Sequence, residues 1–198
     1  MKALKVSKPR SKRGKLCAAA IFLLLSVFLL LLILGLTVFR PRHAVTVVNS
    51  VRLTGVRAGF NAPALGVDVN ATLLLDISVT NPNRAGFRYP DGGTAELYYR
   101  GTLVGEAAIP PGEIGTEETI QMNVTLTVMA GRLIADSNVY SDVLSGSLPL
   151  TTYTKIAGRV TVMGWFKHHV VTSTTCDVVV NISTQTLTNS DCKYKTKL

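Results

Sequence analysis

The chain has 198 residues, 47% of them apolar, and carries a net charge of +9 from 21 Lys and Arg against 12 Asp and Glu. This length allows one ordinary domain with an appendage, and the high apolar fraction together with a charged fraction of only 17% argues against a disordered chain. The basic excess is local, because residues 1–15 hold seven basic residues and no acidic one, whereas residues 40–198 carry only +2. We therefore expect anionic lipid headgroups beside the N-terminal segment, and no nucleic acid, as the partner of this charge.

An uncharged apolar segment covers residues 16–39, and 17 of its 24 residues are Leu, Ile, Phe or Val. A helix of this length spans about 36 Å, more than the roughly 30 Å of a bilayer's hydrocarbon core. A cleavable signal peptide has an apolar stretch of about 7 to 15 residues followed by small residues, whereas this one ends at Phe39-Arg40-Pro41-Arg42. We predict an uncleaved transmembrane signal anchor, with residues 1–15 as a basic cytosolic tail.

A short linker is expected at residues 40–44, followed by a domain at 45–198. The sequence of this domain has the alternating pattern of β-strands. Residues 119–128 alternate strictly between apolar and polar, which is typical of a half-buried strand. The alternation recurs at residues 73–79 and 176–182, and Gly- and Pro-rich turns separate the segments. Further strands are expected at residues 44–53, 94–100, 103–109, 148–155 and 158–167. The pattern predicts a mainly β domain, a single antiparallel β-sandwich.

One region of this domain departs from the strand pattern. Residues 129–144 read as helical, with Asn138 as the cap of the second half and Gly146 at the end. We therefore expect one short helix within the sandwich.

The tripeptide Asn81-Pro82-Asn83 ends the strand at 73–79. Pro82 has no N–H and pushes Asn81 toward extended geometry, so strand pairing stops there. The side chains of Asn81 and Asn83 are suited to bonding local backbone groups. We interpret the tripeptide as a structural strand-end motif that sets up a tight corner, in preference to a binding site.

Three Asn-X-Ser/Thr triplets begin at Asn70, Asn123 and Asn181, all in the part predicted to be exoplasmic. Asn123 and Asn181 fall on the polar parity of their strands, where a glycan faces solvent. We predict glycosylation at one or more of the three sites.

The chain has three cysteines. Cys17, at the cytosolic end of the apolar segment, is either a palmitoylation site or a plain apolar residue of the span. Cys176 and Cys192 share the oxidising side, where they either form a disulfide between the last predicted strand and the C-terminal tail or remain free thiols.

The sequence contains no recognisable motif for catalysis or metal binding. The histidines are His43, His168 and His169, and the last two are adjacent, so on a strand they point to opposite faces. No zinc-protease, nucleophile-elbow or phosphate-loop motif occurs. We expect no enzyme, no metal site and no cofactor.

Four segments of the sequence are familiar as a set: "VTNPN" at 79–83, "YYRGTLVGEAAIPPG" at 98–112, "CDVVVNIS" and "CKYKTKL". With the basic tail and single span before them, they resemble the plant late embryogenesis abundant group 2 family, and within it the harpin-induced-like and non-race-specific-disease-resistance-like membrane-anchored proteins. The resemblance implies a fibronectin type III-like sandwich with a helix at 128–137, in the plasma membrane or the endoplasmic reticulum of a plant cell. The Arg-Gly-Asp and Asn-Gly-Asp tripeptides of some relatives are absent here, so their wall-contact mechanism is not carried over.

Two functional hypotheses follow. The first is a non-enzymatic, membrane-anchored protein of plant defence or abiotic-stress response, which binds other membrane or wall proteins at the cell surface. The alternative is a lipid-binding or membrane-contact module close to the bilayer, with Trp165, Phe166, Lys167 and His168 as an aromatic and basic rim.

Overall fold

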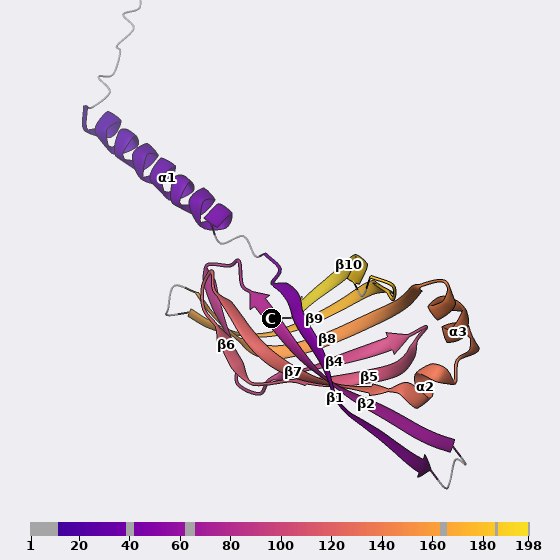
Figure 1. Ribbon diagram of the computed structural model, residues 1–198. Helices are drawn as coiled ribbons and strands as arrows, with labels where there is room; N and C mark the ends of the chain where they lie inside the picture. The colour runs from indigo at the N-terminus through magenta and orange to yellow at the C-terminus, as the bar shows by residue number, and fades with distance from the viewer. Residues whose placement is uncertain (1–11, 39–41, 62–65, 163–165, 185, 198) are drawn as a thin grey trace, which may run out of the picture. The chain divides into compact units, whose positions relative to one another are not determined.

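The structure is a computed structural model that describes residues 12–38, 42–61, 66–162, 166–184 and 186–197 (Figure 1). The chain divides into two compact units, Met1–Pro41 and Arg42–Leu198.

The first unit contains a single described helix, α1 (Lys12–Val38). Within it the 20-residue segment Cys17–Leu36 has a mean hydropathy of 3.1 and is long and apolar enough to cross a membrane. Its large apolar side chains are exposed on all sides, as Phe22, Leu29 and Leu36 illustrate. A helix that is apolar all round needs an apolar environment, so the helix is compatible with the predicted anchor.

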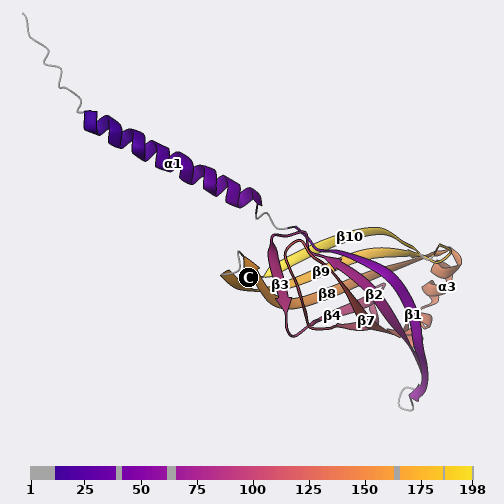
Figure 2. The same ribbon diagram turned by 60° about the vertical axis from the view of Figure 1, so that its left-hand side comes forward.

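The second unit is an antiparallel sheet of ten strands in the order β1-β2-β7-β5-β4-β8, with β9 and then β10 beyond β8. The second half of β8 pairs with β3, which in turn pairs with β6. Figures 1 and 2 show that the sheet is strongly curved. The strands are β1 (Val45–Asn61), β2 (Gly66–Thr80), β3 (Ala85–Tyr89), β4 (Gly93–Tyr99), β5 (Thr102–Ile109), β6 (Gly112–Ile114), β7 (Thr119–Met129), β8 (Ser147–Val162), β9 (Phe166–Asn181) and β10 (Thr186–Lys197). The predicted mainly β, antiparallel architecture is confirmed.

One face of the sheet, the inner face, is apolar. Directly opposite residues of antiparallel strands share a face, so the register of β2 and β7 places their apolar residues together, as the alternation predicted. The pairs are Leu73–Leu126, Leu75–Val124, Ile77–Met122 and Val79–Ile120. The polar residues between them lie on the opposite, outer face.

Two short helices, α2 (Ala130–Ile134) and α3 (Ser137–Leu144), follow β7. The core is built where α3 meets β4 and β5, around the buried residues Tyr99, Val104 and Val139. The side chains of Leu97, Leu133, Leu148 and Leu150 pack against these three residues.

The helical region differs from the prediction in two respects. It forms two helices where one was expected, and Asp136, rather than Asn138, caps the second. The Asp136 side chain accepts a hydrogen bond from the Asn138 N–H at 2.9 Å. Gly146, with φ of +78°, lies just past the end of α3, as predicted.

Two other sequence predictions were wrong. The strands expected at 148–155 and 158–167 are not separate: β8 runs without a break as far as Val162, and residues 166–167 already belong to β9. Gly158, the first residue of the second expected strand, lies inside β8: a Cβ on it would lie 2.5 Å from the Arg88 carbonyl and 2.7 Å from the Phe87 ring, so the glycine permits close strand packing. The lysine-rich C-terminal segment, expected as a tail, forms the edge strand β10, and lysines are typical of such edges.

Candidate functional site

The Asn-Pro-Asn corner is built around Asn81, a polar residue that is only 6% exposed. Its amide nitrogen donates to the carbonyls of Ala85 and Gly115, at 2.8 and 2.7 Å. Its Oδ1 accepts from the backbone N–H and the side-chain amide of Asn83, at 3.1 and 3.0 Å. The Asn81 N–H itself donates to the Glu118 carbonyl at 2.8 Å. The side chain therefore ties the end of β2 to the start of β3 and to the loop between β6 and β7.

Asn83 connects this corner to the residue that precedes β1 by three positions. Its Oδ1 accepts from the Arg42 N–H, and its Nδ2 donates to the Arg42 carbonyl, each at 2.7 Å. The sequence predicted local backbone contacts for Asn83, and this contact spans 41 positions of the chain. The paired hydrogen bonds fix the segment through which the chain enters the domain.

The next residue, His43, contacts the opposite edge of the sheet. Its ring stacks on that of Tyr194 in β10, with centroids 3.7 Å apart. We call the end of the sheet at which Arg42, His43, Asn81 and Asn83 lie the entry end. Three segments far apart in sequence meet there: the start of β1, the Asn-Pro-Asn corner and β10.

A second polar cluster, away from the entry end, holds α3 on the sheet. The fully buried Tyr99 donates its hydroxyl to Asp142 of α3 at 2.8 Å, and Arg100 bonds both residues, at 3.1 Å to the Tyr99 oxygen and 3.2 Å to Asp142. Burial, followed by the bond to Asp142, raises the pKa of Tyr99. The bond from Tyr99 and the neighbouring Arg100 lower the pKa of Asp142. This cluster was not predicted from the sequence, because Asp142 lies 43 and 42 positions from Tyr99 and Arg100.

The three predicted glycosylation sites all lie on the outer face. In the register Asn70 opposes Arg57, Asn123 opposes Asp76, and Asn181 opposes Ser147. Asn123 is exposed, and Asn70 and Asn181 are half-buried. Asn181 Oδ1 accepts from the N–H groups of Ser183 and Thr184, at 3.1 and 3.0 Å. Asn123 is thus the most accessible of the three, and its glycosylation stays a prediction.

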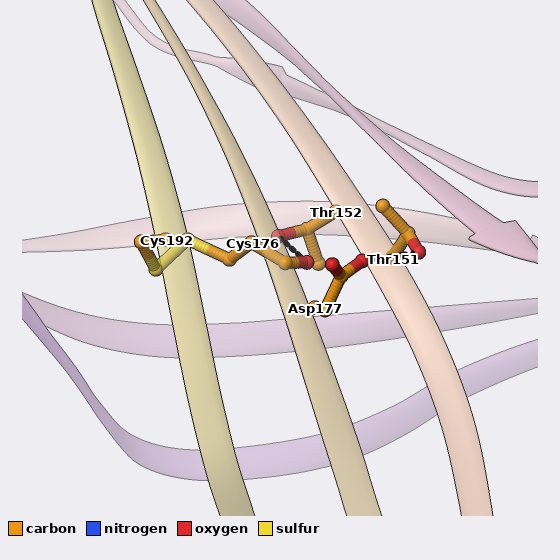
Figure 3. The surroundings of a disulfide bond; sticks show 5 residues. All are labelled: Thr151, Thr152, Cys176, Asp177 and Cys192. Carbon is orange, nitrogen blue, oxygen red and sulfur yellow. Dashed lines mark hydrogen bonds between the residues drawn. A yellow bond between two sulfur atoms is a disulfide. The ribbon is translucent and has the colours of Figure 1, made fainter.

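Cys176 of β9 and Cys192 of β10 form a disulfide between directly opposite positions of the two strands (Figure 3). On the β8 side of Cys176, the Thr152 hydroxyl donates to the Cys176 carbonyl at 3.4 Å. The disulfide therefore fixes the edge strand β10 to the rest of the sheet. Cys17 is a free, exposed cysteine on α1, and its palmitoylation stays a prediction.

The histidines are dispersed. His168 and His169 are exposed neighbours on β9, opposite Val160 and Arg159. Among the described residues no three His, Cys, Asp or Glu side chains form a group that could hold a metal ion. Of the rim named in the lipid hypothesis, Lys167 and His168 are exposed, whereas Trp165 lies outside the described residues.

Comparison with known proteins finds similarity to late embryogenesis abundant proteins. A family model described as late embryogenesis abundant protein matches residues 76–176. Late embryogenesis abundant protein At1g64065 of Arabidopsis thaliana is 25% identical over 187 residues, which cover 94% of this chain and 86% of that protein.

Two solved structures are also similar. A protein from Archaeoglobus fulgidus is 10% identical with a TM-score of 0.32, covering 74% of this chain and 96% of that one. The solution structure of AT1g01470 from Arabidopsis thaliana is 14% identical with a TM-score of 0.30, covering 79% and 85%. TM-scores this low support no argument about fold or function.

Proposed function

The chain belongs to the late embryogenesis abundant group 2 family, and we propose that it is a non-enzymatic, membrane-anchored protein of plant stress or defence responses. It acts by binding other membrane or wall proteins at the cell surface. The family membership suggests the stress-related, non-enzymatic role. The observation that carries the anchoring is the apolar segment Cys17–Leu36, whose large side chains are exposed on every side of α1.

The orientation in this proposal is supported by charge, cysteines and sequons together. Seven basic residues precede the span and favour a cytosolic N-terminus. The Cys176–Cys192 disulfide is typical of an oxidising compartment. The three sequons lie on the outer face of the same domain, opposite its apolar inner face. The plasma membrane is the proposed location, with the endoplasmic reticulum as the alternative.

Two experiments test the proposal. Carbonate extraction of membranes from plant cells expressing the tagged chain should leave it in the pellet, and release into the supernatant would contradict anchoring. Immunoprecipitation from stressed and unstressed tissue should recover a set of membrane or wall proteins that changes with stress. An unchanged set would count against the interaction role.

Lipid binding is the second candidate function, favoured by the first strand. The register places Val48, Val51 and Leu53 opposite Ile77, Leu75 and Leu73, which puts them on the apolar inner face. Their exposed fractions are nevertheless 42%, 56% and 62%. Exposed apolar surface of this kind marks interaction sites. Photo-crosslinkable phospholipid in the membrane that holds the full chain should label β1, and labelling confined to α1 would argue against this function.

A further inference from the structure

All five lysines of residues 42–198 lie in three neighbouring strands of the sheet (Figure 2). They are Lys155 in β8, Lys167 in β9, and Lys193, Lys195 and Lys197 in β10. Lys155 and Lys195 oppose the same residue of β9, Ser173, from its two sides. Directly opposed residues share a face, as do residues two apart on a strand, so the five lysines and Arg159 of β8 lie on one face. We call these six residues the basic face.

The basic face belongs to the outer face of the sheet. Lys155 opposes Thr94 of β4, Thr94 opposes Ala108 of β5, and Ala108 opposes Thr125 of β7. Thr125 is one of the polar residues that alternate with the apolar inner-face residues of β7. The basic face is therefore turned away from the apolar inner face, and all six of its residues are exposed.

The positive charge of the basic face has no acidic partner among the described residues. The ion pairs in the described part of the chain join Arg84, Arg88 and Arg100 to acids elsewhere. Over residues 153–162, 166–175 and 193–197 the three strands contain no acidic residue. The acids on this face begin at one end of it, where Asp177 and Asp191 oppose each other and Glu96 opposes Tyr153. Away from that end the surface attracts anions.

A shallow depression of about 740 Å³ lies on the basic face. The lysines that line it are Lys155, Lys193, Lys195 and Lys197. The half-buried Tyr153 also lines it, and its hydroxyl donates to the Ser173 hydroxyl of β9 at 3.4 Å. Tyr153 itself opposes Thr175, two positions from Ser173. The bond therefore tilts the tyrosine ring across β9, so that the ring lies along the sheet among the lysines.

The cations form rows and do not converge on one point. Residues two apart on a strand are separated by about 7 Å, so Lys193, Lys195 and Lys197 present three ammonium groups in line along β10. Lys155 and Arg159 run beside them along β8. A single phosphate or carboxylate ion can engage few of these groups. A linear polymer with a carboxylate on every unit can engage the whole row.

The ring and the hydroxyls between the rows favour sugar units in such a polymer. The face of an aromatic ring carries partial negative charge, and the C–H groups of a pyranose carry partial positive charge, so a sugar ring can stack on Tyr153. Ser173 and Thr175, which also line the depression, offer hydroxyls that donate and accept hydrogen bonds. An acidic polypeptide would neutralise the lysines without using this aromatic surface.

We propose that the basic face binds a linear acidic polysaccharide, a chain of uronic acid units whose carboxylates lie against the lysines and one of whose rings lies on Tyr153. The proposal goes beyond the protein partners of the proposed function. It rests on that function in one respect, because the domain must lie outside the cytosol to meet such a polysaccharide at the surface of a plant cell.

The test uses the full chain in nanodiscs of phosphatidylcholine, with oligogalacturonate as the ligand and the acetylation rate of each lysine, measured by mass spectrometry, as the readout. At a concentration that leaves about a tenth of the chain free, the four lysines of the depression should react about tenfold more slowly. Raised salt should restore the rates. The methyl-esterified oligomer, which keeps the sugar rings but lacks the charge, should protect much less. Unchanged rates at every concentration of oligogalacturonate would overturn the proposal.

Two charge-reversal variants locate the contact. Lys193→Glu combined with Lys195→Glu should remove most of the protection at the two remaining lysines of the depression. Arg52→Glu combined with Arg57→Glu makes the same change in net charge at exposed positions of β1, and should leave the protection in place. Equal loss of protection in the two variants would show a net-charge effect and overturn the assignment to this face.

Two variants of Tyr153 test the sugar ring. Tyr153→Ala should weaken protection by oligogalacturonate several-fold, whereas Tyr153→Phe, which keeps the ring, should retain it. Polyglutamate, an acidic polypeptide, should protect the same lysines less well. Equal protection by the two polymers, unaffected by Tyr153→Ala, would assign the basic face to an acidic polypeptide and overturn the proposal. The charge-reversal pair keeps the test decisive if Tyr153→Ala does not fold.

Failure of this proposal is distinguishable from failure of the proposed function. Both sides of a nanodisc are open to the ligand, so the acetylation measurement does not depend on the orientation of the chain, and absent protection overturns the polysaccharide proposal alone. A domain found on the cytosolic side of cell membranes contradicts the proposed function instead, whatever the nanodisc result.

Discussion

The ring of His43, two residues before the first strand, lies nearly parallel to that of Tyr194 in the last strand, at an interplanar angle of 10°. β1 and β10 each end a branch of the hydrogen-bonded strand order, so this contact joins two edge strands that are not neighbours in that order. Because exposed strand edges promote aggregation, a contact that joins two edges at the entry end protects the start of β1 and the C-terminal end of β10.

Replacing Tyr194 by alanine should loosen the entry end without unfolding the domain. An aromatic pair contributes about 0.5–1.5 kcal/mol beyond its buried area, and the effect should stay local. Amide hydrogen exchange should become faster at Val45–Val48 and in β10. Tyr140→Ala, which removes an exposed tyrosine of α3, serves as the control, and identical exchange at Val45–Val48 in both variants would contradict the role of the stack.

Asn81→Ala should destabilise the domain by about 2–3 kcal/mol. The substitution leaves the carbonyls of Ala85 and Gly115 without their donor in a buried place, and unpaired buried groups are costly. Chemical denaturation of the chain in detergent measures the loss. Asn49→Ala is the matched control, because that exposed amide bonds the Ser78 hydroxyl, and it should cost less than about 0.5 kcal/mol. Similar losses in the two variants would mean that the corner is not a structural centre.

Two buried tyrosines should respond in opposite ways to loss of their hydroxyl groups. The Tyr89 hydroxyl has no hydrogen-bond partner among the described residues, and burial raises its pKa. Tyr89→Phe should leave the melting temperature unchanged or raise it, because an unsatisfied polar group is removed. Tyr99→Phe should lower the melting temperature, because Asp142 and Arg100 lose a partner. The measurement is the difference in melting temperature between Tyr89→Phe and Tyr99→Phe. Equal melting temperatures would contradict the different roles given to the two hydroxyl groups.

Breaking the disulfide should destabilise the domain by about 3 kcal/mol, the value expected for a loop of about 15 residues. Cys176→Ser and Cys192→Ser should have the same effect singly and together, and the released β10 should become sensitive to proteases. Cys17→Ser, outside the domain, is the control and should change neither stability nor proteolysis. If Cys176→Ser and Cys192→Ser are as stable and as resistant to proteases as Cys17→Ser, the disulfide does not stabilise the domain.

Much of the fold follows from the sequence because alternation on the strands is a local property. The apolar residues of 73–79 and 119–128 predicted one buried face, and the register places them directly opposite each other. Local residue types gave wrong predictions where pairing with a distant strand decides the structure. The segment 193–197 was expected as a tail, yet it pairs with β9. A gap was expected at residues 156–157, yet β8 continues through it to Gly158, where the close approach of β3 requires a glycine.

Less of the candidate site than of the fold could be predicted from the sequence. The Asn-Pro-Asn corner was correctly read as a strand end, since proline chemistry is local. Its contact with Arg42 and the stack of His43 on Tyr194 depend on strand order, which periodicity does not encode. The gathering of lysines on one face of the last three strands has the same origin, because residues scattered from 155 to 197 come together only once β8, β9 and β10 are paired.

The central proposal is that the domain lies outside the cytosol at the end of a membrane anchor. The most direct measurement is the glycosidase sensitivity of a tagged chain expressed in plant cells, combined with protease treatment of intact microsomes. We predict a loss of mass on deglycosylation, abolished by Asn→Gln substitution at residues 70, 123 and 181 together, and a domain protected from protease. No mass change and a domain digested from the cytosolic side would contradict the account.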